Sequence, residues 1–327
     1  MRFGLAAYSF PWRCGFTEYG TVGLCANPYT ADDLLDLAAR NGLTVIELPF
    51  QMFPDLEPAT LRRFRDRADS LGLAIVSDSG VVDVPTLQRH IPAAAALGAR
   101  TLRVTLSKIL EGNRASAPGG WEPYLQQKIA QLQELRPLAE HCGVCIAPEN
   151  HQDATTADQI RICDEVGGDF IGATLDAVNP LAVGEHHLEA ARALGPRIRN
   201  VHLKDYQIYL SPSGYRLVRC AIGEGVLNLP ALLAILSEVA PDVTCNIELA
   251  ALRARHVRLL EDDWWQGFPP RDARALVPAL RLAYEHARPS GEDWRTPFER
   301  DDDADALSTY EEGQMARSIE YLHSVTS

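Results

Sequence analysis

Short apolar runs alternate with longer amphipathic runs along most of the chain, and this alternation restricts the fold more than any other feature of the sequence. The apolar runs have the length of β-strands, and the runs between them space their apolar residues as helices do. The predicted strands cover residues 2–10, 43–49, 73–80, 100–106, 144–150, 170–176, 198–205 and 243–250. The predicted helices cover residues 31–42, 59–72, 83–99, 119–143, 155–167, 186–195, 228–240 and 270–287. Strands that alternate with helices pair in parallel and are buried on both faces, so the pattern predicts an α/β protein with a parallel sheet.

Eight strand–helix units predict that the sheet closes into a (β/α)8 TIM barrel. The alternative is an open doubly wound sheet, which usually carries a glycine-rich phosphate loop after its first strand. The segment "SFPWRCG" (9–15) stands at that place and is no such loop, so the closed barrel is favoured. We therefore expect residues 1–288 to form a barrel catalytic domain, followed at residues 289–327 by an extension with an acidic linker and a helix.

Three segments lie outside the repeat. Residues 11–29 form a long first loop, and residues 206–227 form another, which contains "GEG" (223–225). The extension carries the acidic run "FERDDDADA" and then a helix-like stretch over residues 305–324. That helix either covers the barrel or reaches a partner subunit, and the sequence does not choose between the two.

Charge and composition exclude some classes of protein. The net charge of −13 at pH 7 argues against a nucleic-acid partner, because such proteins need a basic face. No run of about 18 apolar residues exists, so no membrane span is predicted. The seven cysteines are scattered, which fits free thiols in a reducing compartment. The N-terminus does not have the pattern of a signal peptide, and a cytoplasmic location is expected.

Four predicted strands end on side chains that bind divalent metals, namely Glu149, Asp176, His202 and Glu248. In a barrel of this kind the active site lies at the carboxyl ends of the strands, so the four side chains are expected to line one arc of the mouth. Three carboxylates placed together repel one another unless a cation lies between them. Oxygen-rich ligands with one histidine suit Mn²⁺, Mg²⁺ or Co²⁺. The alternative is four unrelated polar residues that bond to neighbouring loops.

A family resemblance rests on the segments "APENH" (147–151), "TLDAVNP" (174–180), "VHLKD" (201–205), "GEG" (223–225) and "NIELA" (246–250). In this order and spacing they resemble the xylose isomerase-like TIM barrels, a group that includes sugar-phosphate isomerases and epimerases, ketose 3-epimerases, hydroxypyruvate isomerases, inosose dehydratases and endonuclease IV. The resemblance implies that Glu149, Asp176, His202 and Glu248 are the metal ligands. It also implies that the two glutamates transfer protons. Endonuclease IV is disfavoured, because it needs further histidines and a basic DNA-binding face.

Five further residues are candidates for contact with substrate: Glu47, His151, Asn179, Lys204 and Arg219. "VIELP" (45–49) resembles the family's second strand end, which places Glu47 near the mouth. His151 and Lys204 each lie two residues beyond a predicted ligand, and so point the same way if the strand continues. Asn179 stands where ketose 3-epimerases usually carry a histidine, and a plain turn is its alternative role. Arg219 precedes "GEG" and is a candidate for binding a hydroxyl or phosphate, or else lies in a solvated loop.

The first functional hypothesis is a divalent-metal-dependent isomerase or epimerase of a sugar or keto-sugar. Its reaction would pass through a metal-stabilised enediolate, with Glu149 and Glu248 for proton transfer. The alternative is a dehydratase or lyase that eliminates a β-leaving group from an inosose or keto-glycoside at the same site. A binding module without chemistry is a third hypothesis, against which the intact ligand set argues. The expected cofactor is Mn²⁺, with Mg²⁺, Co²⁺ or Zn²⁺ as alternatives. The expected partner is a small-molecule substrate, and the extension is a candidate contact for a homo-oligomer or partner subunit.

Overall fold

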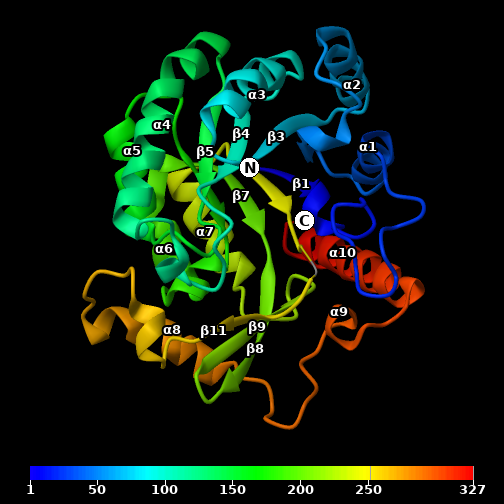
Figure 1. The fold of residues 1–327 in the computed structure, drawn as a ribbon. Helices are drawn as coiled ribbons and strands as arrows, with labels where there is room; N and C mark the ends of the chain where they lie inside the picture. Colours follow the sequence, from blue (N-terminus) through cyan, green and yellow to red (C-terminus); the bar gives the residue numbers. More distant parts are fainter. Residues whose placement is uncertain (251, 327) are drawn as a thin grey trace.

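Parallel strands close into a barrel in the computed structural model, which describes residues 1–250 and 252–326 (Figure 1). The order around the barrel is β1-β10-β7-β6-β5-β4-β3-β2. Barrel strands that follow one another along the chain are therefore paired with one another, and the first pairs with the last, which confirms the barrel prediction. The barrel strands are β1 (Arg2–Ala6), β2 (Val45–Pro49), β3 (Ala74–Val81), β4 (Thr101–Thr105), β5 (Cys145–Glu149), β6 (Ala173–Asp176), β7 (Ile198–Leu203) and β10 (Thr244–Ile247).

The strand register places Asp176 and His202 at one level of the barrel and the other two predicted ligands within two residues of it. Asp176 at the end of β6 is paired with His202 on β7. His202 is paired in turn with Asn246 on β10, so Glu248 follows two residues beyond that level. Glu149 ends β5 and is paired with Thr174 on β6. The carboxyl ends of β5, β6, β7 and β10 therefore form one continuous arc.

Helices cover the outside of the barrel because each presents an apolar stripe to the strands. In α1 the buried residues Leu34, Leu35 and Ala38 form that stripe, and Thr30 caps the helix in a reciprocal bond with Asp33. The covering helices are α1 (Ala31–Arg40), α2 (Pro58–Ser70), α3 (Val84–Ala96), α4 (Trp121–Cys142), α5 (Thr156–Val166), α6 (His187–Leu194) and α7 (Leu229–Val239). None of the described helices is both long and apolar enough to cross a membrane.

A small antiparallel sheet follows β7, and here the prediction of a loop over residues 206–227 was wrong. Strands β8 (Asp205–Ser211) and β9 (Gly214–Cys220) form a hairpin, and β11 (Arg255–Val257) pairs with β9. The segments "YQIYL" and "YRLV" alternate apolar and polar residues, which is the pattern of a half-buried strand. The turn between them is "SPSG", and its Gly214 is needed because a Cβ there would lie 2.2 Å from the carbonyl oxygen of Val257.

The segments that follow β10 lie at the mouth end of the barrel (Figure 1). Helix α8 (Ala273–Glu285) forms where a helix was predicted, but the segment that ends it bonds to the small sheet, because the N–H of Arg288 donates to Ile208 at 2.8 Å. Two more helices follow, α9 (Pro297–Arg300) and α10 (Ala304–Thr326). In α10 the buried Met315, Ile319 and Leu322 join the main hydrophobic core. The extension therefore packs on its own chain, and a contact with a partner subunit stays a prediction.

Candidate metal and active site

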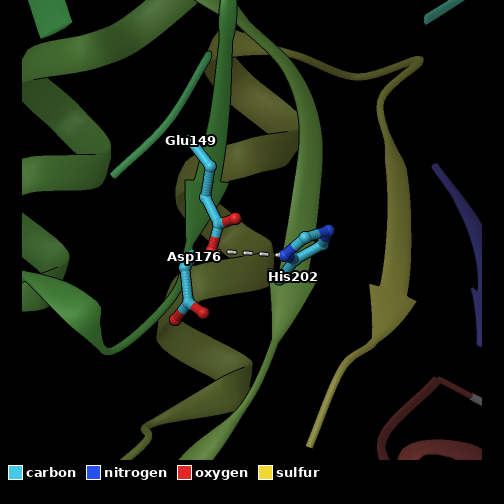
Figure 2. A group of neighbouring side chains, drawn as sticks. All are labelled: Glu149, Asp176 and His202. Atoms are coloured by element: carbon cyan, nitrogen blue, oxygen red, sulfur yellow. Dashed lines mark ion pairs between the residues drawn. The ribbon is translucent and has the colours of Figure 1, made fainter. Parts of the chain in front are cut away.

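Three of the predicted ligands form a buried group at the carboxyl ends of adjacent strands. Ligand atoms of Glu149, Asp176 and His202 all lie within 4.8 Å of one another. Figure 2 shows the three side chains close together, with His202 facing the carboxylate of Glu149. The Nδ1 atom of His202 lies 3.6 Å from Oε1 of Glu149. All three residues are shielded from solvent, so charge that is not neutralised here is costly.

Glu47 on β2 sets the orientation of His202. Its two carboxylate oxygens lie 2.9 and 3.0 Å from Nε2 of the imidazole. Nδ1 is left facing Glu149 and has no hydrogen-bond partner among the described residues. Burial opposes a charged imidazole, yet the carboxylates of Glu47 and Glu149 hold the pKa of His202 well above its usual value. An imidazole that donates through one nitrogen to a carboxylate and turns the other toward a group of carboxylates has the geometry of a metal ligand.

Arg103 on β4 fixes one side of Glu149 and was not singled out from the sequence. Its Nε donates to Oε2 of Glu149 at 2.7 Å, its Nη2 contacts the same oxygen, and its Nη1 donates to Asp78 at 2.9 Å. Burial alone would raise the pKa of Glu149, but the Arg103 guanidinium holds it well below its usual value. The other oxygen of Glu149 remains turned toward His202. An arginine inside the apolar strand "TLRVT" was the available signal, because a buried arginine needs a carboxylate partner.

Lys204 connects Asp176 to Glu248. Its Nζ lies 2.5 Å from a carboxylate oxygen of each residue. Glu248 stands outside the group of three, although its Oε2 is 4.0 Å from Nδ1 of His202. Burial raises the pKa of Glu248 above its usual value, while the Lys204 ammonium opposes that shift. The ammonium of Lys204 therefore supplies positive charge between Glu248, the fourth predicted ligand, and Asp176 in the group of three.

The donor set fits a divalent cation. Carboxylate oxygens from Glu149 and Asp176 and a free imidazole nitrogen from His202 are ordinary ligands for Mn²⁺, Zn²⁺ or Co²⁺. When the neutral imidazole donates through Nε2 to Glu47, the buried and unpartnered Nδ1 carries a lone pair that would bind the ion. Glu248 would complete the set only by exchanging its bond to Lys204 for a bond to the ion.

Asn179 lies in the turn that was considered for it, and a contact with substrate stays a prediction. Its backbone N–H, like that of Val178, donates to Oδ1 of Asp176 at 3.2 Å, so the turn holds that carboxylate in place. Its side-chain nitrogen lies 3.5 Å from Oε1 of Glu149, so the amide also faces the ligand group. The hydroxyl of Tyr206 donates to its side-chain oxygen at 3.1 Å.

His151 and Arg219 lie beside the group rather than in it. His151 is half-buried, its Nδ1 has no partner among the described residues, and burial lowers the pKa of its imidazole to about 3. It is therefore neutral near pH 7 and can accept or donate one hydrogen bond to a ligand. Arg219 lies on β9, where the small sheet faces the barrel, and it is buried.

The "GEG" segment is explained by Asp205, the last residue of "VHLKD". The Asp205 carboxylate accepts hydrogen bonds from the backbone N–H groups of Gly223, Gly225 and Leu227 at 2.8–3.0 Å. A Cβ at Gly225 would lie 2.3 Å from the carbonyl oxygen of Tyr206, so the loop closes only around glycine. This anchor fixes the end of β9 and with it the position of Arg219.

Tyr8, after β1, is a further mouth residue that the sequence did not reveal. Burial, with Asp78 and Glu248 nearby, raises the pKa of its phenol to about 12. Its ring packs against Phe16 with 4.8 Å between the ring centroids. The phenol therefore stays protonated and can donate a hydrogen bond at the edge of the ligand group.

Comparison with known sequences and solved structures finds several proteins similar to this chain. A "3-oxo-isoapionate decarboxylase" of Pectobacterium atrosepticum is 25% identical over 235 residues, which is 71% of this chain and 79% of the relative. Among solved structures, D-psicose 3-epimerase from Clostridium cellulolyticum H10 superposes with a TM-score of 0.61 at 12% identity and covers 97% of this chain and 98% of its own. A structure of the IOLI protein with a zinc atom has a TM-score of 0.54 at 16% identity and covers 95% and 99% of the two chains.

The structural similarities are below 25% identity and concern the fold. The assignment to a family comes from the sequence pattern, because the model of the xylose isomerase-like TIM barrel matches residues 35–265, a range that includes β5, β6, β7 and β10. The chain therefore belongs to the xylose isomerase-like TIM barrel family.

Proposed function

We propose that this protein is a divalent-metal-dependent isomerase or epimerase of a sugar or keto-sugar. The observation that carries the proposal is the buried group of Glu149, Asp176 and His202, in which the imidazole Nδ1 faces two carboxylates and has no hydrogen-bond partner among the described residues. The similarity to a D-psicose 3-epimerase and to a protein with a zinc atom supports it. Mn²⁺ is the proposed ion, with Mg²⁺, Co²⁺ or Zn²⁺ as alternatives.

A cation bound by these residues would polarise a substrate carbonyl and stabilise the enediolate that forms when the neighbouring carbon loses its proton. The proton transfers are assigned to the chain's own carboxylates, Glu149 and Glu248, on either side of the group. The contact with Lys204 favours the ionised form of Glu248, which can accept a proton, against the burial that raises its pKa. Glu47 holds His202 in the orientation that exposes Nδ1, so its proposed role is positioning.

His151 and Asn179 are proposed to orient the substrate hydroxyls. Both present polar atoms beside Glu149, where the reacting carbon of a substrate would lie. A neutral imidazole and an amide suit this task, because each can donate or accept a hydrogen bond without adding charge to a crowded site.

A dehydratase or lyase that uses the same groups is the second candidate. Asn179 replaces the histidine usual in ketose 3-epimerases, and the relative from Pectobacterium atrosepticum is named as a decarboxylase. Both reaction classes place negative charge on a carbon next to a carbonyl, so the site serves either. The difference lies in whether a proton returns to the carbon or a leaving group departs.

Two measurements test the proposal. Anomalous scattering from crystals soaked in Mn²⁺ should place an ion among Glu149, Asp176 and His202, and an ion elsewhere or none would overturn the metal site. Incubation with Mn²⁺ and a panel of keto-sugars and inososes, followed by NMR, should show a rearranged sugar. Loss of water or another leaving group from the substrate would favour the lyase instead.

A further inference from the structure

Two arginines face the barrel from the same side of the small sheet. The pairing of β9 with β11 places Arg255 opposite Leu217, and Arg219 is two residues further along β9. Residues two apart in a strand, and residues paired across strands, point to the same face. Leu217 is fully buried, so this is the inner face of the sheet.

That inner face is directed at the candidate active site. Tyr206 is paired with Arg219 across β8 and β9 and so shares its face. The Tyr206 hydroxyl lies 3.1 Å from Oδ1 of Asn179 and 3.3 Å from Nε2 of Gln152. Both of these residues follow the strands that carry Glu149 and Asp176, so the two arginines lie above the ligand group.

Neither arginine has an acidic partner among the described residues. Arg219 is only 5% exposed, and its Nε and Nη1 make no hydrogen bond to the protein. The buried Nε of Arg255 also makes none. Two other buried cations among the described residues have acidic partners, Arg103 with Asp78 and Glu149 and Lys204 with Asp176 and Glu248, whereas the buried Lys128 donates to the carbonyl oxygen of Val82.

The two guanidinium groups also repel each other. Burial, followed by the charge of Arg219, lowers the pKa of Arg255 to about 10, and Glu248 is among the groups that act in the opposite direction. Two like charges that are desolvated and unpaired destabilise a folded protein unless a ligand brings the opposite charge. A guanidinium group presents its N–H donors in a fork that matches carboxylate and phosphate oxygens.

We propose that Arg219 and Arg255 bind an anionic group of the substrate, so that the substrate is a sugar acid or a sugar phosphate rather than a neutral sugar. The inference rests on the proposed function, because it takes the neighbouring ligand group as the place of reaction. It assigns Arg219 a definite role, and it adds Arg255, which the sequence did not single out. The anion would be held by the small sheet while the sugar carbons reach Glu149 and Glu248.

Calorimetric titration of the full chain with three probes tests this proposal. The probes are D-gluconate, D-glucitol 6-phosphate and neutral D-glucitol, each titrated with and without Mn²⁺. We expect at least one anionic probe to bind about 10-fold or more tightly than D-glucitol, the scale of a lost charge-assisted hydrogen bond. Preference for gluconate identifies a carboxylate site and preference for the phosphate ester a phosphate site, whereas equal binding of all three probes overturns the proposal.

Matched variants locate the discrimination. Arg219→Met and Arg255→Met should each weaken binding of the anionic probe by a larger factor than binding of D-glucitol, so that the two affinities become similar. Arg216→Met is the control, because Arg216 lies on the same strand, points to the other face and stacks on Trp294 with 4.5 Å between its guanidinium carbon and the ring centroid. If both single variants and the double variant still bind the anionic probe more tightly than D-glucitol, the two arginines do not hold the anionic group.

The stability of the variants provides an independent reading. Because the two charges are unpaired and repel, the methionine variants should melt at the same temperature as the parent chain or higher. If one does not fold, Arg219→Lys keeps the charge without the fork and should show intermediate affinity. If the chain binds the anionic probe more tightly than D-glucitol but has no Mn²⁺ site, only the proposed metal chemistry is refuted. If it has the Mn²⁺ site but binds all probes equally, only the anionic substrate is refuted.

Discussion

The ammonium group of Lys204 lies 2.5 Å from a carboxylate oxygen of Glu248, and the same nitrogen lies 2.5 Å from Asp176. One lysine thus holds together two of the four residues that the family resemblance assigns to a metal. All three residues are buried, so the attraction between them is weakly screened. A cation that bound Glu248 would compete with Lys204, and the strength of that competition can be measured.

Replacing Lys204 by methionine should make the fold depend on metal. The change leaves Asp176 and Glu248 as neighbouring buried carboxylates, and breaking a buried pair in this way costs roughly 3–5 kcal/mol of unfolding free energy. Added Mn²⁺ should recover more stability in the variant than in the parent chain, because the ion no longer competes with an ammonium. Thermal melts with Mn²⁺ and with a chelator measure this difference.

The matched control for that variant is Lys128→Met. Lys128 is also buried, but its Nζ donates to the carbonyl oxygen of Val82 at 2.7 Å, away from the carboxylates. Its melting temperature should fall without any gain in the response to Mn²⁺. Equal responses to Mn²⁺ in Lys204→Met and in the parent chain would show that Lys204 and the ion do not share Glu248.

Glu47→Gln tests the orientation of His202. Glutamine keeps the size of the side chain but removes the negative charge that binds Nε2 of the imidazole. Loss of such an outer partner typically weakens metal binding by about 10- to 100-fold. Titration with Mn²⁺ monitored by electron paramagnetic resonance gives the affinity directly, and the exposed Glu57→Gln serves as control. An unchanged affinity would mean that Nδ1 of His202 is not a ligand.

The barrel and the ligand arc were accessible from sequence because both follow from periodicity. Buried parallel strands are short apolar runs, and a polar residue that ends such a run, as Asp176 does, marks the mouth of the barrel. Figure 1 shows the hairpin of β8 and β9, which was missed because its strands sit between two barrel units and break the expected rhythm. The pairing of Arg103 with Glu149 was also missed. The carboxylate that pairs with a buried arginine depends on the register of neighbouring strands, which the sequence does not give.

Glu311 should make the stability of the fold depend on pH. Its carboxylate accepts hydrogen bonds from the N–H groups of Trp12 and Arg13 at 2.9 Å, which fastens α10 over the first loop. Burial raises the pKa of Glu311 to about 8, against the opposing effect of those two donors. Because the folded pKa lies above the unfolded value of about 4.3, the folded chain binds more protons between these values. Its contribution to stability is full below about pH 4 and falls as the pH rises toward 8.

The variant Glu311→Gln isolates that contribution. Glutamine resembles the protonated acid, so the parent chain should lose on the order of a few kcal/mol relative to the variant between about pH 5 and 8. Urea unfolding at a series of pH values measures the two free energies. If the unfolding free energies of the parent chain and the variant change in parallel over this pH range, the pKa of Glu311 is ordinary. The two backbone N–H donors would then lower that pKa as much as burial raises it.

Exchange of a carbon-bound proton with solvent tests the chemistry that the isomerase and lyase proposals share. If Glu248 or Glu149 removes a proton next to the carbonyl, turnover in D₂O should place deuterium at that carbon of the substrate or product. Glu248→Gln keeps an oxygen toward the ligand group but cannot accept a proton, so exchange and turnover should fall by about 10²-fold or more, the usual effect of losing a general base. Mn²⁺ should still bind, which separates this loss from loss of the metal site. A chelator should also abolish exchange in the parent chain.

A shielded proton relay between Glu248 and Glu149 could hide the label, since both residues are removed from solvent. Substrate deuterated at the reacting carbon provides the check, because breaking that bond gives a primary isotope effect whether or not solvent enters. Turnover without exchange but with an isotope effect would indicate a proton retained between the two glutamates. Turnover with neither would contradict proton abstraction and leave a hydride shift or hydrolysis as the reaction at this site.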